Sequence, residues 1–126
     1  MSEKCQKVFD EILTLVPTSR FNEIKKEGRG WIRFPIYVHR GLDEMDLEVL
    51  DLSIRSSNCL HRAGYRSIGE LVAAISGVED LMRIRNCGRK SAEEILEKLF
   101  CFQYEQLDSQ RKIKYIYRVL EMNQDR

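Results

Sequence analysis

The sequence predicts an all-α fold, and three observations support this prediction. Apolar residues recur at helical spacing on both sides of Gly88. Residues 2–16 and 108–124 each carry one apolar stripe at the same spacing. The segment 31–38 is rich in β-branched and aromatic residues, but Pro35 interrupts it and the sequence offers no obvious partner strand. We therefore expect helices joined by short turns, with one extended segment that lies on the helices or forms a minimal hairpin.

Length and composition restrict the class of protein. A chain of 126 residues, 43% of them hydrophobic, is long enough to bury the core of one compact domain with appendages. The formal net charge is only +1, so the molecule as a whole is not a polycation. A local basic face on such a molecule can still bind nucleic acid.

The cysteines and the N-terminus exclude further classes. The four cysteines form no Cys-x-x-Cys pair and the two histidines lie in no ligand-spaced cluster. We therefore expect no metal, no cofactor and no disulfide framework. The first residues lack an apolar signal core, and no window has the roughly 18 apolar residues of a membrane span. We expect a cytoplasmic protein with reduced cysteines.

The first 46 residues are expected to form an extension of the main domain. A helix is expected over residues 2–16, because Pro17 ends its apolar stripe. A short second helix is expected to run through Lys26 and to end at Gly28. The segment 41–51 carries five acids and no cation. We interpret it as a solvated lead-in, with an acidic docking surface as the alternative.

Two capped helices are expected to open the main domain, which we place at residues 47–107. Ser53 precedes a helix that runs to residue 63, and Gly64 stands just past its end. Ser67 and Glu70 have the spacing of a capping box at the start of a helix that runs to residue 75.

Three further helices are expected to complete the protein. They comprise a short helix over residues 78–84, a long helix from Arg89 or Lys90 to Phe100, and a last helix within residues 108–126. Asp108 or Ser109 is a suitable cap for the last helix. A weak repeat of the apolar–glycine–apolar pattern, seen first around Gly64 and again around Gly88, suggests two hairpins packed as a pair. The predicted architecture is thus a paired helix-hairpin-helix domain with extra helices at both ends.

The turn around Gly88 is the strongest functional signal. Between residues 81 and 91 the sequence has four cations and no acid. A turn that leads into a helix N-terminus offers free backbone N–H groups and the positive end of the helix dipole, both of which suit a phosphate. Binding of nucleic acid is therefore the first hypothesis. The alternative is that Gly88 merely satisfies a positive φ and that the cations form a solvated face.

Residues 47–103 resemble the C-terminal domain of the bacterial RNA polymerase alpha subunit. The motifs that carry the resemblance are Arg-Ser-x-Asn-Cys-Leu from residue 55, Ala-Gly at 63–64 and Asn-x-Gly-Arg-Lys-Ser from residue 86. The resemblance implies a compact, SAM-like pair of helix-hairpin-helix units. It also implies binding to the minor groove of AT-rich DNA upstream of promoters, and contacts with sigma factors and activators.

The resemblance assigns roles to particular residues. Arg55 matches the arginine that enters the minor groove, and Glu94 matches the acid that orients this arginine or its neighbours. The remaining positions lie one turn further along the helix of Arg55 or at the hairpin backbone. The full predicted DNA-binding set is Arg55, Asn58, Cys59, Gly88, Lys90, Ser91 and Glu94.

Ordinary structural roles remain open for several of these residues. Cys59 is suitable as a small buried side chain, Ser91 as a helix cap, and Glu94 as an ion-pair partner of Lys98 four residues on. Arg55 has the clearest case for function, because a cation near the start of a helix opposes the dipole yet suits a narrow, negative minor groove.

The departures from the family pattern also carry information. No polymerase-assembly domain of alpha is present in this sequence, so we expect a small stand-alone protein. Cys87 stands where the family usually has leucine. Val49 replaces an acid that often assists Asp51, at a position that the family uses toward sigma.

Two functions follow from the sequence, and neither is enzymatic, because no catalytic set or phosphate-binding glycine loop emerges. The first is a DNA-binding protein of bacterial transcription. The alternative is a protein-interaction module that binds a sigma factor, an activator or a second copy of itself.

Overall fold

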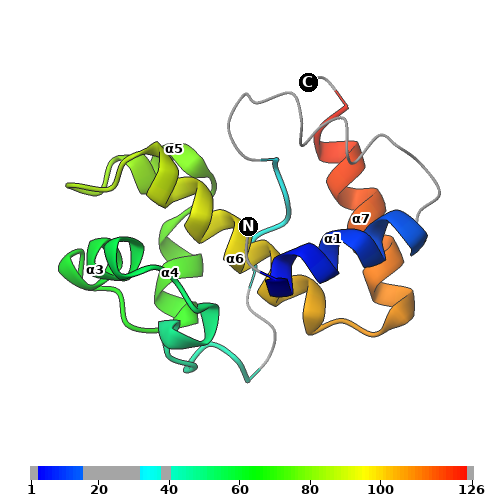
Figure 1. Ribbon diagram of the computed structural model, residues 1–126, viewed down its shortest axis with the longest axis horizontal. Coiled ribbons are helices and arrows are strands. Elements are labelled where there is room, and N and C mark those ends of the chain that lie inside the picture. Colours follow the sequence, from blue (N-terminus) through cyan, green and yellow to red (C-terminus); the bar gives the residue numbers. More distant parts are fainter. Residues whose placement is uncertain (1–2, 16–31, 38–40, 125–126) are drawn as a thin grey trace.

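The computed structural model describes residues 3–15, 32–37 and 41–124, and the regular structure of these residues is entirely helical (Figure 1). The all-α prediction is therefore confirmed. The helix expected through Lys26 lies outside the described residues. None of the helices in the described ranges is long and apolar enough to cross a membrane. The elements are α1 (Glu3–Leu15), η1 (Leu47–Leu50), α3 (Ile54–Arg62), α4 (Ile68–Ala74), α5 (Val78–Met82), α6 (Arg89–Glu105) and α7 (Ser109–Met122).

Helix α6 is the central element of the fold. It passes from the group of α3, α4 and α5 on the left of Figure 1 to α1 and α7 on the right. It packs against α1, α3, α5 and η1. The helix continues five residues beyond its expected end at Phe100, because Cys101 and Tyr104 are also buried and continue its apolar face.

An aromatic cluster around Phe100 joins the two ends of the chain to α6. Phe9 of α1 stacks on Phe100 with 5.8 Å between ring centroids. Phe34 approaches the same ring edge-on at 5.4 Å, and Tyr115 of α7 lies at 5.8 Å. The terminal segments therefore share one hydrophobic core with α6, as their apolar stripes require.

The segment 32–37 lies on α6 and α7, and two side-chain amides hold it. Asn123 accepts a hydrogen bond from the Arg33 N–H at 3.1 Å and donates one to the Arg33 carbonyl at 2.8 Å. Gln103 donates to the Pro35 carbonyl at 2.7 Å. These amides satisfy backbone groups that a partner strand would otherwise pair. The expectation of a segment lying on helices is correct, and the minimal hairpin does not form within the described residues.

The interpretation of residues 41–51 as a solvated lead-in is correct for its five acids, which are all exposed, but wrong for the segment as a whole. Leu47 and Leu50 are buried in the core, and the Leu47 N–H donates to the Arg66 carbonyl. The Gly69 N–H donates to the Asp43 carbonyl, and a Cβ at Gly69 would lie only 2.8 Å from that oxygen. The pattern of charges indicated solvent, but backbone hydrogen bonds join this segment to the start of α4, and η1 with its two buried leucines packs on α6.

The helix caps follow the local sequence signals. Ser53 accepts from the Ser56 N–H and caps α3. Ser67 and Glu70 form the expected capping box at α4. Asp108, rather than Ser109, is the N-cap of α7. Each cap satisfies a backbone N–H group that has no partner inside its helix.

Candidate nucleic-acid interface

An open hollow of about 650 Å³ lies between α3 and the N-terminal end of α6. Six of the seven residues predicted from the sequence line it, and Glu94 does not. Three further lining residues were not predicted. The complete lining is Ile54, Arg55, Asn58, Cys59, Arg62, Asn86, Gly88, Lys90 and Ser91.

One face of α3 forms the first wall of the hollow. Arg55, Asn58 and Arg62 follow one another at spacings of three and four residues, so their side chains share this face. All three are at least partly exposed. Cys59 also lines the hollow but is buried, with 2% of its surface exposed. The wall therefore presents two cations and an amide above a buried thiol.

The turn before α6 is tied to α3 through this thiol. The Cys59 Sγ–H donates to the Asn86 carbonyl at 3.1 Å. Asn86 has a φ of 66°, in the left-handed region that asparagine tolerates better than most residues. Cys87 is buried behind the turn, and burial together with the neighbouring Cys59 raises its pKa to about 11. The Cys87 thiol is therefore neutral at physiological pH and acts as a small apolar anchor.

The N-terminus of α6 forms the second wall. Gly88 is the N-cap, and no capping hydrogen bond from a side chain is present there. The first turn of α6 contains no acid. Ser91 lies buried in this turn and is not the cap, so that alternative was wrong. The first N–H groups of α6 therefore face the hollow without the internal carboxylate or hydroxyl that caps many helices.

Gly88 is not required by the fold itself. Its φ is −79°, so the alternative that it satisfies a positive φ was wrong, and Asn86 takes that role instead. A Cβ at Gly88 would meet nothing within 4 Å. Neither backbone conformation nor packing inside the protein explains the glycine. A side chain here would extend into open space at the N-terminus of α6.

Glu94 does not line the hollow and instead holds the start of α3. Its carboxylate accepts hydrogen bonds from the Ser53 N–H at 2.9 Å and the Ser53 hydroxyl at 2.7 Å, and a third from the Ser56 hydroxyl. Burial would raise the pKa of Glu94, but the hydrogen bonds from Ser56 and Ser53 outweigh it and lower the pKa below its ordinary value. The amine of Lys98 donates to the Asp51 carbonyl at 2.8 Å.

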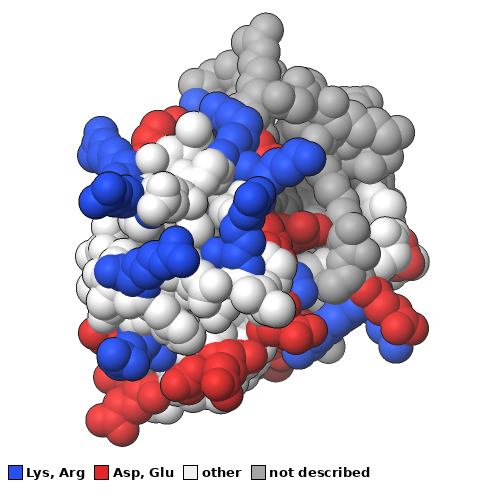
Figure 2. All heavy atoms as spheres, turned by 60° about the vertical axis from the view of Figure 1, so that its left-hand side comes forward, with Lys and Arg blue, Asp and Glu red and all other residues white. Residues whose placement is uncertain are grey.

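Figure 2 shows cations spread over the upper and middle part of one face, whereas most of the acids visible there lie along its lower edge. Arg83 pairs with Asp80, and Arg89 pairs with Glu93. By contrast, the described part of the protein supplies no ion-pair partner to the three cations that line the hollow, which are Arg55, Arg62 and Lys90. Their charge is therefore available to an external anion.

Sequence reasoning missed Ile54, Arg62 and Asn86 as lining residues. The helical spacing of Arg62 from Arg55 was a usable signal, because seven residues are two turns. Ile54 follows the cap directly and gave no such signal. The position of Asn86 depends on its left-handed backbone, which becomes visible only once the turn is built.

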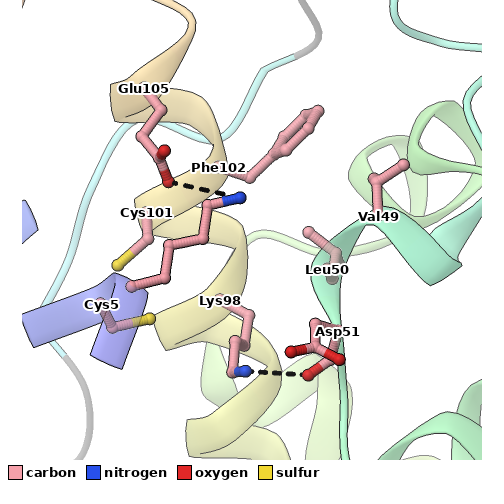
Figure 3. A pocket seen from close by; sticks show the side chains of 9 residues that line it. Cys5, Val49, Leu50, Asp51, Lys98, Cys101, Phe102 and Glu105 are labelled. Carbon is pink, nitrogen blue, oxygen red and sulfur yellow. Dashed lines mark hydrogen bonds and ion pairs between the residues drawn. The ribbon is translucent and has the colours of Figure 1, made fainter. Parts of the chain in front are cut away.

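A second, much smaller cavity lies where α1 meets η1 and α6. It is only about 40 Å³ in volume. Figure 3 shows Cys5 and Cys101 facing each other at one side of it. Lys4 lies 3.9 Å from Glu105, and Lys98 reaches the Asp51 carbonyl at the other end. This space holds about one or two waters. Among the described residues, no cluster of three or more metal-ligating side chains exists.

A small helical module with an open cationic hollow between two helices is the class of domain that these observations define. The family model for the C-terminal domain of the bacterial RNA polymerase alpha subunit matches residues 38–100, which is half of the sequence. The protein belongs to this family.

Curated relatives agree with this assignment. The protein is 52% identical over 58 residues to the DNA-directed RNA polymerase subunit alpha of Carboxydothermus hydrogenoformans, a match that covers 46% of this protein and 18% of the relative. It is 55% identical over 56 residues to the same subunit of Alkaliphilus oremlandii, a match that covers 44% of this protein and 17% of the relative. The protein thus spans less than a fifth of the length of these relatives. No solved structure matches it significantly.

Proposed function

We propose that this protein binds duplex DNA in the hollow between α3 and α6, that Arg55 enters the minor groove of AT-rich sequence, and that the protein acts in bacterial transcription. One observation carries the proposal. Six residues that the family pattern assigns to DNA line a single open hollow, and the cations among them have no acidic partner in the described residues.

The α6 wall suits a phosphate of one DNA strand. Its first N–H groups lack a capping side chain, and Lys90 adds a positive charge beside them. Gly88 leaves the approach open, since it places no side chain in front of these groups. Free N–H groups, a helix dipole and a cation together make an anion-binding site. Such a contact positions the protein on DNA without reading sequence.

The α3 wall suits the groove beside that strand. The start of α3 already has an internal anion, Glu94, so a phosphate there would be repelled. The exposed Arg55 guanidinium is instead free to enter a groove, and Asn58 follows one turn later. AT-rich sequence has a narrow minor groove with enhanced negative potential, which attracts arginine. The α6 wall would therefore contact a phosphate, and the α3 wall would contact the groove.

The same geometry weighs against the alternative of a pure protein-interaction module. A face of Arg55 and Lys90 covered by the N-terminal segment would favour that alternative, whereas both residues are exposed. Contacts with a sigma factor or an activator remain compatible with DNA binding, because they would use other surfaces such as that of Asp51. Nothing in the proposed role requires catalysis or a cofactor.

Fluorescence anisotropy with labelled AT-rich and GC-rich duplexes at several salt concentrations tests the proposal. The AT-rich duplex should bind more tightly, and log K should fall with log salt with a slope of a few units, since each neutralised phosphate contributes about −0.9. A salt-independent signal, or no binding at low salt, would contradict the proposal.

A further inference from the structure

An exposed isoleucine borders the hollow, and DNA binding through cations does not explain its presence. Ile54 is the first residue of α3 and lies next to Arg55. It is 81% exposed, whereas the other exposed large apolar side chains of the described residues range from 41% to 54%. It lines a hollow whose other side chains include three cations and two amides.

The fold gives no reason for an isoleucine at this position. Its side chain adds almost nothing to the core, and a β-branched residue gains nothing at a helix start over alanine or leucine. A single exposed apolar residue is ordinary in itself. Ile54 borders a hollow whose cations have no ion-pair partner in the described residues. An anionic ligand that fills the hollow would therefore also remove the Ile54 side chain from water.

The geometry points to an apolar contact between Ile54 and deoxyribose. In B-form DNA a narrow minor groove holds its walls close to any inserted side chain. In A-form RNA the minor groove is wide and shallow and presents 2′-hydroxyl groups. We propose that Ile54 packs on the sugar wall beside Arg55 and makes the site select DNA duplex over RNA duplex. This inference rests on the proposed function and names the residue that distinguishes the two nucleic acids.

Apolar burial and charge neutralisation leave different experimental signatures. Loss of a phosphate contact lowers the salt slope, because fewer counterions are released. Loss of an apolar contact lowers affinity at every salt concentration and leaves the slope unchanged, since no counterion is involved. Partial burial of one isoleucine side chain corresponds to about a tenfold change in affinity.

The test compares Ile54→Ser, Ile54→Val and wild type on DNA and RNA duplexes of the same AT-rich sequence, at low salt where weak binding is measurable. We expect Ile54→Ser to bind DNA about tenfold more weakly with an unchanged salt slope, and to bind RNA as wild type does. The ratio of DNA to RNA affinity should therefore fall about tenfold. Ile54→Val keeps an apolar β-branched side chain and should stay within about twofold of wild type.

Leu13→Ser provides the matched control, because Leu13 is an exposed apolar residue of α1 and does not line the hollow. This substitution should change neither the affinity for the DNA duplex nor that for the RNA duplex. Circular dichroism confirms that each variant is folded. The inference is overturned if Ile54→Ser binds DNA like wild type, loses DNA and RNA affinity equally, or lowers the salt slope. Absence of salt-dependent DNA binding by wild type would instead contradict the proposed function itself.

Discussion

The Glu94 carboxylate accepts hydrogen bonds from both the N–H and the hydroxyl of Ser53, at 2.9 and 2.7 Å, across 41 residues of sequence. This contact joins α6 to the first turn of α3, and Arg55 stands two residues after Ser53. The acid thus fixes the relative position of the two walls of the hollow. Any effect of Glu94 on Arg55 would therefore pass through α3 rather than through a direct contact.

Replacement of Glu94 by glutamine should lower the free energy of unfolding by about 1–2 kcal/mol at pH 7, because charge-assisted hydrogen bonds to the start of α3 are lost. The pKa of Glu94 is lowered in the folded state. Its contribution is therefore fully present above the unfolded pKa of about 4.3, and it is lost as the pH falls through the folded pKa. Urea unfolding at pH 7, 4 and 3 should show that the difference in the free energy of unfolding between wild type and Glu94→Gln becomes smaller as the pH falls.

Glu93→Gln is the control for this experiment, because Glu93 is the neighbouring acid on α6 and pairs with the exposed Arg89. It should change stability by less than about 0.5 kcal/mol at every pH. If the free energy of unfolding of Glu94→Gln differed from that of wild type by the same amount from pH 7 to pH 3, the assigned role of the Glu94 charge would be refuted.

Arg55→Ala should separate folding from DNA binding. The side chain is exposed and has no ion-pair partner in the described residues, so stability should change by no more than about 0.5 kcal/mol. Binding to the AT-rich duplex should fall sharply, and the preference for AT-rich over GC-rich duplex should shrink. Lys90→Ala should instead weaken binding to both duplexes equally, since a phosphate contact carries no sequence information. A folded Arg55→Ala protein with unchanged AT-rich binding would favour the protein-interaction alternative.

Arg62→Ala tests whether the hollow extends to the C-terminal end of α3. Arg62 lines the hollow without an ion-pair partner in the described residues. Its removal should make the salt slope shallower by about 0.9 if it neutralises one phosphate. Arg83→Ala removes an equal charge that pairs with Asp80 and does not line the hollow. Equal slopes for the two variants would show that Arg62 acts only through net charge.

Gly88→Val should lower DNA binding without destabilising the fold. The φ of −79° suits any residue, and a Cβ there meets nothing within 4 Å. The added side chain would stand between a phosphate and the first N–H groups of α6, so affinity should fall at least about tenfold for both duplexes. Anisotropy measures the affinity, and thermal unfolding monitored by circular dichroism measures the stability.

Gly69→Ala is the opposite case and serves as the comparison. Its Cβ would lie 2.8 Å from the Asp43 carbonyl oxygen, so the segment before η1 would have to move and the melting temperature should drop. If Gly88→Val lowered the melting temperature as Gly69→Ala does, Gly88 would have a structural role that its open surroundings do not indicate.

Local features of this protein could be predicted from the sequence. The capping box of Ser67 and Glu70 depends on groups three residues apart, and it forms as predicted. Arg55 and Asn58 share a face because the helical repeat places them there. Each of these features depends on neighbours within one or two helical turns, so the pattern of residue types was sufficient to find it.

The relationships between distant segments were decided only by the tertiary structure. The bond from Gln103 to the Pro35 carbonyl spans 68 residues, and the bond from Ser53 to Glu94 spans 41. Leu47 is buried, so an acidic segment that was expected to be solvated is held to the core by its leucines while its acids stay exposed. The left-handed residue of the turn is Asn86, which left Gly88 free of that role. A polar group has many potential partners along the sequence, and only the packing of the helices selects the one it contacts.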